Sequence, residues 1–204
     1  MKLTDFAHSL AIKNNKETDF GYVESLKFDI LGYRASIIAS LDDRTISELY
    51  YQKLSNFSIV EKEGVKSIKI PKLLTFKDGS FKIAVSLQYK GKFKSISVIS
   101  EENASYLEGR KFSKNQPFVI LSEDTLYTKN FDPSLITNLS INGIFNNPVD
   151  VLAYSKANNC KLESKCIKDD DLDIEDSLYQ KIVIFVYKQL GIEENQNQIL
   201  TANN

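Results

Sequence analysis

The chain has 204 residues and carries 26 lysines and arginines against 27 aspartates and glutamates, so its formal charge is −1. With one histidine and two cysteines, a zinc cluster would need carboxylates to complete its ligands, and the near-neutral charge argues against global nucleic-acid binding. Hydrophobic residues make up 42% of the chain, which is enough to build a core, and the length suits one domain, alone or with a sub-domain. The composition therefore predicts a folded protein and excludes much common enzyme chemistry.

The first zone, residues 1–55, is predicted to be helical. Thr4 can cap a short helix, and either Thr18 or Asp19 can cap a longer one. The helical spacing places Arg34 of the longer helix mostly away from its apolar face. Apolar residues recur along that helix at spacings of three and four, which predicts one buried face made of Val23, Leu26, Ile30, Tyr33, Ile37 and Leu41.

The second zone, residues 56–147, has the alternating pattern of β-strands. Asp78-Gly79 is a strong hairpin signal, and the strand that follows alternates apolar and polar side chains from Phe81 to Tyr89. A second turn at Lys90-Gly91 leads into another strand. We therefore expect an antiparallel β sub-domain, inserted between the N-terminal helices and the end of the chain.

Residues 148–192 are predicted to form a connecting segment and a closing helix. The run from Asp169 to Asp173 is too charged for a core and predicts a loop, while Gly191 suits the C-terminal stop of the helix. Residues 193–204 are polar, and we expect them to be a mobile tail. The predicted fold class is α+β, in which the N-terminal helical pair and the C-terminal helix pack as a small bundle around an inserted antiparallel β sub-domain.

Targeting signals are not evident in the sequence. The N-terminus lacks the apolar core of a signal peptide, and no apolar run approaches the length of a membrane span, so we expect no membrane association. Cys160 and Cys166 either form a disulfide or stay reduced, and the lack of a secretion signal favours the reduced pair.

The charge is distributed unevenly. Residues 64–114 carry 11 basic and 4 acidic side chains, whereas residues 1–63 carry 8 and 10 and residues 115–204 carry 7 and 13. One interpretation, which we favour, is a solvated sheet face whose edge lysines prevent aggregation. The other is a face that meets an acidic surface, either a neighbouring subunit or nucleic acid. The opposite signs within one chain would also suit head-to-tail contact between copies.

The sequence contains no recognisable catalytic motif. It has no phosphate-binding loop, no dinucleotide-binding fingerprint and no nucleophile elbow. His8 has no partner motif, and we expect it to be a surface or interface histidine. The acidic run lacks the spacing of a calcium loop. We therefore predict that the protein is not an enzyme and has no catalytic residue, no cofactor and no metal site.

Three segments carry a family resemblance. The long helix is followed by Leu49-Tyr50-Tyr51-Gln52-Lys53-Leu54, the β zone opens with Ser67-Ile68-Lys69-Ile70-Pro71, and the segment from Leu139 to Pro148 contains an apolar strand, Gly-Ile-Phe and a later proline. Together they resemble the head-to-tail adaptor, or ring, proteins of short-tailed, crAss-like bacteriophages. The chain departs from that family where acidic residues 173–176 replace a Pro-rich start of the closing helix.

The resemblance implies a virion structural protein, made in the host cytoplasm. It implies a ring of identical subunits, expected to be twelve-fold, in the head-to-tail connector between portal and tail, which gives a path for DNA ejection. The implied partners are further copies of the chain, the portal, and other tail or ring proteins, with packaged DNA in the channel contacted without sequence specificity. Such a ring requires heterologous contacts that close on themselves.

Aromatic and basic side chains are the candidates for contacts between subunits. A tyrosine supplies contact area and a polar tip, although the tyrosines could equally line the rim of the monomer's own core. An alternative function is an intracellular binding or immunity-type protein that neutralises a charged partner, because such proteins are also small and lack motifs. The candidate interface residues are Tyr22, Tyr33, Tyr50, Tyr51, Lys82, Lys92, Lys94 and Phe145.

Overall fold

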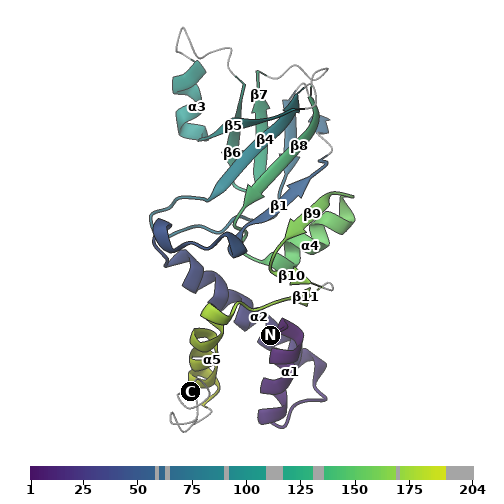
Figure 1. The fold of residues 1–204 in the computed structure, drawn as a ribbon, viewed down its shortest axis with the longest axis vertical. Coiled ribbons are helices and arrows are strands. Elements are labelled where there is room, and N and C mark those ends of the chain that lie inside the picture. Colours follow the sequence, from purple (N-terminus) through teal and green to yellow (C-terminus); the bar gives the residue numbers. More distant parts are fainter. Residues whose placement is uncertain are drawn as a thin grey trace. The chain divides into compact units, whose positions relative to one another are not determined.

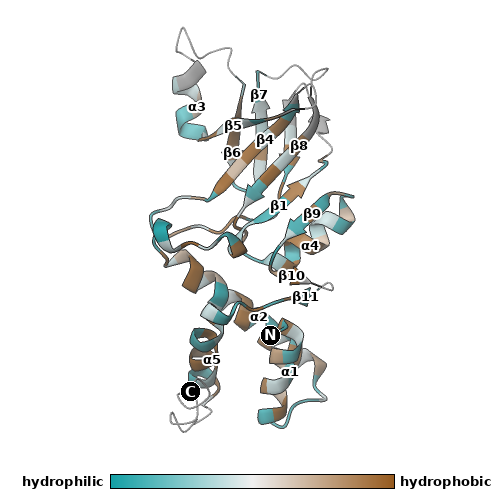
Figure 2. Cartoon of the chain, viewed as in Figure 1, coloured by the Kyte–Doolittle hydropathy of each residue, from teal (hydrophilic) through white to brown (hydrophobic). Residues whose placement is uncertain are grey.

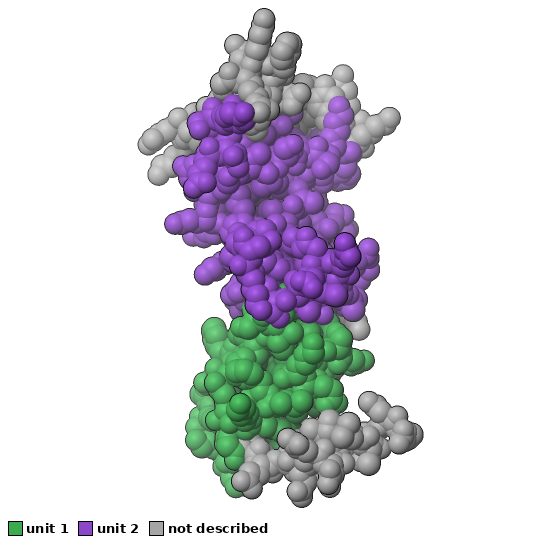
Figure 3. Space-filling model, turned by 90° about the vertical axis from the view of Figure 1, so that its left-hand side faces the viewer, with its two compact units in different colours: residues 1–38, 171–204 green, residues 39–170 purple. Residues whose placement is uncertain are grey.

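The computed structural model divides the chain into two compact units, which Figure 3 colours separately. Unit 1 comprises residues 1–38 and 171–204, and unit 2 comprises residues 39–170. Unit 2 is therefore inserted in the sequence of unit 1. The structure describes residues 1–57, 60–62, 65–89, 92–108, 117–130, 136–168 and 171–191. The predicted turn at Lys90-Gly91 and the predicted tail lie outside these ranges.

Unit 1 contains three helices, α1 (Leu3–Lys13), α2 (Phe20–Ala39) and α5 (Asp176–Leu190), with the short strand β11 (Asp171–Leu172) (Figure 1). The helical pair and the closing helix are confirmed. Apolar residues from all three helices form the core of this unit, because each helix buries one face. The rings of Phe6 and Tyr179, for example, lie 5.2 Å apart between centroids.

The helix ends of unit 1 correct two predictions. Helix α1 begins one residue before Thr4, with Lys2 at its N-cap, and the Thr4 amide donates to the carboxylate of Asp171. Asp171 therefore holds the start of α1 and belongs to a strand, not to the loop predicted for the acidic run. Of the two proposed caps of α2, Asp19 accepts from the Tyr22 amide. Gly191 ends α5 with a φ of 64°, as predicted.

Unit 2 is built on one nine-stranded sheet with the strand order β2-β3-β7-β6-β5-β4-β8-β1-β9. The predicted α+β class is confirmed. Most neighbours are antiparallel, but β5 and β6 pair in parallel, so the sheet is mixed rather than wholly antiparallel. The strands of this unit are β1 (Gln52–Ser55), β2 (Val60–Lys62), β3 (Val65–Lys69), β4 (Ile83–Tyr89), β5 (Lys92–Ser100), β6 (Phe118–Ser122), β7 (Thr125–Lys129), β8 (Ile136–Gly143), β9 (Lys161–Ser164) and β10 (Ile167–Lys168).

The sheet of unit 2 curls around one apolar core (Figure 1). Strands from both halves of the strand order contribute to this core, for example Ile68 of β3 and Leu54 of β1. The alternation predicted for β4 is observed, since Val85 and Leu87 are buried. Figure 2 shows the apolar bands that result on β4 and β8. The predicted turn is present, with Gly79 at a φ of 78°, but its two sides are joined by an isolated bridge between Thr75 and Phe81 and not by paired strands.

Four short helices complete unit 2. The 3-10 turns Asp43–Thr45 and Glu48–Tyr50 lead into β1, so residues 52–55 are a strand where we predicted helix. Helix α4 (Pro148–Ala157) lies in the predicted connecting segment, and α3 (Glu101–Glu108) was not predicted. Ala104 of α3 packs against β6, so this helix covers a second, smaller apolar cluster.

Candidate subunit interface

Two candidate tyrosines lie on unit 1, and both are half-buried. The Tyr22 hydroxyl accepts from the Asn14 amide at 3.0 Å, and the Lys16 ammonium lies 4.6 Å from the centroid of its ring. The ring of Tyr33 lies 3.8 Å from that of Phe185 between centroids. Desolvation by burial, with a smaller contribution from the Asp29 carboxylate, raises the pKa of the Tyr33 hydroxyl. Part of each tyrosine ring therefore packs against other residues of unit 1.

Tyr50 and Phe145 lie inside unit 2. Their side chains are 5% and 1% exposed, so they present almost no surface to another subunit. Phe145 belongs to the main core cluster, and its backbone forms an isolated bridge with Leu73. The segment Gly-Ile-Phe thus supplies core packing after the end of β8. The Tyr50 side chain is therefore buried within the monomer, in line with the alternative that the tyrosines belong to the monomer's own core.

The three candidate lysines lie in unit 2, on or next to β4 and β5. Lys82 precedes β4, and its ammonium donates to the Asp43 carboxylate at 2.6 Å. That hydrogen bond is the main reason why the pKa of Lys82 is raised. Lys94 lies on β5 opposite Leu87 and is exposed. Lys92 is in the same strand, where only its backbone is described.

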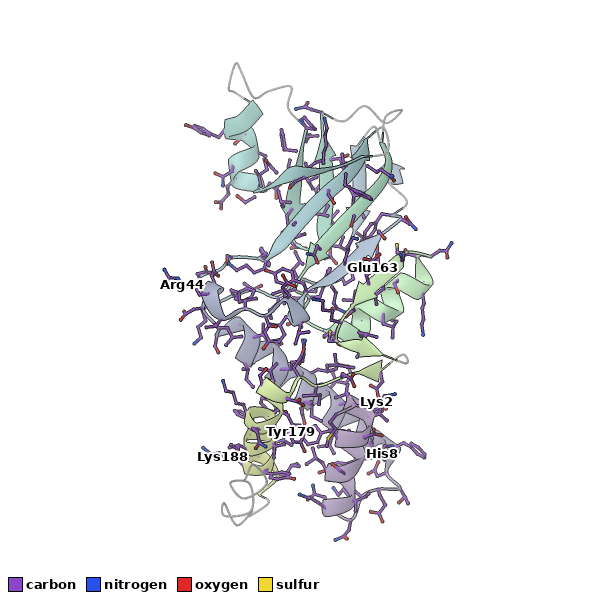
Figure 4. The ribbon with its side chains drawn as sticks, in the orientation of Figure 1. Lys2, His8, Arg44, Glu163, Tyr179 and Lys188 are labelled. Atoms are coloured by element: carbon purple, nitrogen blue, oxygen red, sulfur yellow. The ribbon has the colours of Figure 1, made fainter. Side chains whose placement is uncertain are left out.

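Tyr51 lines an open groove of about 610 Å³ on unit 2. Two ion pairs cross its lining, Lys53 to Glu163 at 3.0 Å and Lys165 to Glu48 at 3.2 Å. Glu163, labelled in Figure 4, stands on the edge strand β9. Its pKa is lowered chiefly by a hydrogen bond from Lys161 and then by one from Lys53. The groove is therefore polar, and two acidic groups match two basic groups in its lining.

The exposed apolar side chains form the surface feature that sequence analysis missed. Phe28 of α2 lies off the predicted apolar face and is 73% exposed. Phe185 of α5 is 45% exposed, whereas Tyr187 of the same helix is buried. The break in three-and-four spacing at Phe28 is a signal that could have identified it. Other large exposed apolar side chains are Ile12, Phe20, Leu49, Phe81, Phe93, Tyr106 and Ile184.

Within the described ranges, no three His, Cys, Asp or Glu side chains come together as ligands for a metal ion. His8, labelled in Figure 4, lies half-buried on α1. Helices long and apolar enough to cross a membrane are also absent from the described part of the chain.

Comparison with known proteins gives one family. A family model described as phage tail ring protein 2 matches residues 9–204, which is nearly the whole chain. The chain belongs to the phage tail ring protein 2 family. A search of the curated proteins found no match. This tail ring protein is accordingly a structural component of the virion that forms an oligomeric ring in a crAss-like phage tail, and its family supports a structural rather than an enzymatic role.

Proposed function

We propose that the chain is the repeating subunit of a closed ring in the head-to-tail connector, between the portal and the tail. The observation that carries this proposal is the match of a tail ring family to residues 9–204. We expect twelve copies, whose central channel is the path for DNA during ejection. The portal and other tail or ring proteins are the expected neighbours.

The exposed apolar residues support a role in assembly. Phe20 and Phe28 are 80% and 73% exposed on one helix, and aromatic side chains exposed in this way serve no purpose in a monomer. Burial of such side chains between subunits removes apolar area from water, which stabilises association. We infer that the helices of unit 1 bundle against neighbouring subunits, while unit 2 contacts the adjacent ring.

Exposed lysines in unit 2 support a weak, sequence-independent attraction for DNA. Lys69, Lys72, Lys77 and Lys94 are exposed, and they belong to the segment with the strongest excess of basic side chains. Contacts between lysines and phosphates carry no sequence information and weaken as salt rises. DNA in the channel would therefore pass without being bound at a particular sequence.

Fractionation of purified phage particles tests the proposed function. The particles are disrupted so that portal and tail complexes separate from the capsid shell, and the chain is quantified by mass spectrometry against the portal protein. We expect the chain in the portal and tail fraction at a fixed ratio to the portal. Its absence from particles, or its recovery only as a soluble one-to-one complex with another protein, would contradict the proposal and favour the immunity-type alternative.

A further inference from the structure

Phe28 protrudes from the outer face of α2. Phe28 is 73% exposed, whereas Leu31 and Ala35, at helical spacing on the same side, are only 8% and 7% exposed. Gly32 follows Phe28 by one turn, and a Cβ added there would meet nothing within 4 Å. Glycine is less favourable than alanine in a helix, and the described surroundings give no reason for it here. The close approach of another helix would supply that reason.

The outer face of α5 carries an exposed apolar pair. Ile184 and Phe185 are 59% and 45% exposed, although the rest of the helix packs well. Lys181 and Lys188 are exposed one turn before and one turn after this pair. Figure 4 shows Lys188 on the side of α5 that faces away from α1. An apolar centre with basic flanks is therefore presented to the surroundings.

These two faces lie on different sides of unit 1. Phe185 stacks on Tyr33 of α2, which fixes the side of α2 that α5 occupies. Phe28 precedes Tyr33 by five residues, which places it about 140° away around the helix. One unit therefore presents two different exposed apolar faces on two sides. A heterologous contact that repeats around a ring requires such a pair, because each subunit uses one face for each neighbour.

The charges around the two faces are complementary. Glu24 lies one turn before Phe28, and its side chain is 65% exposed while it pairs with Lys27 at 2.8 Å. The α5 face is flanked by the two lysines and by no acidic residue within one turn of Ile184. Opposite charges at the rim steer association and fix register more than they add affinity.

We propose that a second copy of this chain covers these faces, so that Phe28 of one copy packs against Ile184 and Phe185 of the next. Gly32 lets the two helices approach closely, and Glu24 meets the lysines that flank Ile184. This inference rests on the proposed ring and adds the surface through which adjacent subunits join.

Cross-linking of the full chain tests the pairing of faces. The variants are Phe28→Cys, Ile184→Cys and the double variant, treated with a short bifunctional maleimide, with the wild type as the control for Cys160 and Cys166. We expect a ladder of covalent multimers from the double variant, dimers only from a mixture of the two single variants, and monomer from each alone. A double variant that stays monomeric overturns the pairing, as does cross-linking of either single variant alone.

A matched pair of serine substitutions gives a second readout. Phe28→Ser should lower the association constant about 10- to 100-fold, measured by analytical ultracentrifugation, because it removes one buried aromatic side chain from the contact. Phe93→Ser is the control, since Phe93 is 55% exposed on β5 of the other unit. Circular dichroism confirms that both variants are folded. Equal association of the two variants overturns the inference.

The two proposals fail in different ways. If the chain is found with the portal and tail in particles but neither cross-linking nor Phe28→Ser behaves as expected, the ring remains and this contact is wrong. If the chain is missing from particles, the proposed function itself fails, whatever the purified chain does in solution.

Discussion

The guanidinium of Arg34 and the carboxylate of Glu175 form a buried, two-point ion pair across 141 residues of sequence. Nη2 lies 2.7 Å from Oε1 and Nε lies 3.2 Å from Oε2, and the two side chains are 2% and 6% exposed. The pair joins the middle of α2 to the residue that precedes α5. It therefore ties together the first and last parts of the chain, between which unit 2 is inserted.

Removal of one member of this pair should strongly destabilise unit 1. Arg34→Met leaves a buried carboxylate without its cation, and we expect the free energy of unfolding to fall by about 3–5 kcal/mol, measured by urea denaturation. Lys53→Met is the matched control, because its pair with Glu163 is about 43% exposed at the lysine and should contribute only ~0–1 kcal/mol. Similar losses in the two variants would contradict this assignment.

The burial of Arg34 shows where the local sequence pattern stops predicting the fold. Spacing along α2 correctly predicts that Val23, Leu26 and Ile30 are buried. It fails at Arg34, which is 1% exposed, because the partner that makes its burial tolerable, Glu175, lies 141 residues away in the sequence. The helical spacing of apolar residues predicts which face of a helix is buried, but it carries no information on partners that lie far away in the sequence. The same limit applies to the parallel pairing of β5 with β6, which the sequence did not predict.

Glycine substitutions at two helix positions should change stability in opposite directions. Gly32→Ala adds a methyl group in open space within a helix and should raise the free energy of unfolding by about 0.5–1 kcal/mol. Gly191→Ala forces alanine to a φ of 64° and should lower it by about 1–2 kcal/mol. Urea denaturation of the two variants checks both signs. A stabilising effect at position 191 would refute the left-handed cap.

The proposed contact predicts a trade-off for Gly32→Ala. The added methyl group should stabilise the isolated chain yet weaken association, because it keeps the partner helix further away. Analytical ultracentrifugation of this variant, compared with Ser36→Ala at another exposed position of the same helix, measures the second effect. Unchanged association would count against a role for Gly32 in close helix packing.

Tyr154 should be titrated only at very alkaline pH. Its hydroxyl donates to the Lys69 carbonyl, and burial raises its pKa to about 12. Since the ordinary pKa is 10.0, the folded state holds this proton more tightly than the unfolded state. The resulting stability is fully present below pH 10 and is lost as pH rises towards 12.

The variant Tyr154→Phe isolates this titration. The difference in tyrosinate absorbance between the wild type and Tyr154→Phe should rise with a midpoint near 12. At neutral pH the variant should lose about 0.5–1.5 kcal/mol of stability through the missing hydrogen bond. A difference titration centred near 10, the ordinary value, would show that the side chain is more open to water than the structure indicates.

Charge reversal on α5 should weaken assembly in a salt-dependent way. Lys181→Glu combined with Lys188→Glu places negative charge opposite Glu24 in the proposed contact, so association should fall most at low salt. At physiological ionic strength such surface charges are screened over about 8 Å, and the difference from the wild type should shrink further as salt is added. Association constants over a salt series measure this. A variant that associates as well as the wild type at low salt would contradict the proposed orientation.

The candidate site was less predictable than the fold. Tyr50 was chosen as a candidate contact residue because it is a tyrosine, but its side chain is only 5% exposed. Phe28 and Ile184 are 73% and 59% exposed, but the choice of candidates was restricted to tyrosines, lysines and Phe145 and did not include them. Only the three-dimensional arrangement of α1, α2 and α5 distinguishes the faces that point inward from those that remain exposed.

The central claim is that this chain forms a ring of identical subunits between portal and tail. A single-particle reconstruction of the portal and tail junction in purified phage particles tests it most directly, with the two units fitted separately. We predict a closed ring of copies in the connector, expected to be twelve-fold, in which α2 of each copy lies against α5 of the next. Density that places the chain elsewhere in the particle, or a junction without it, would contradict the account.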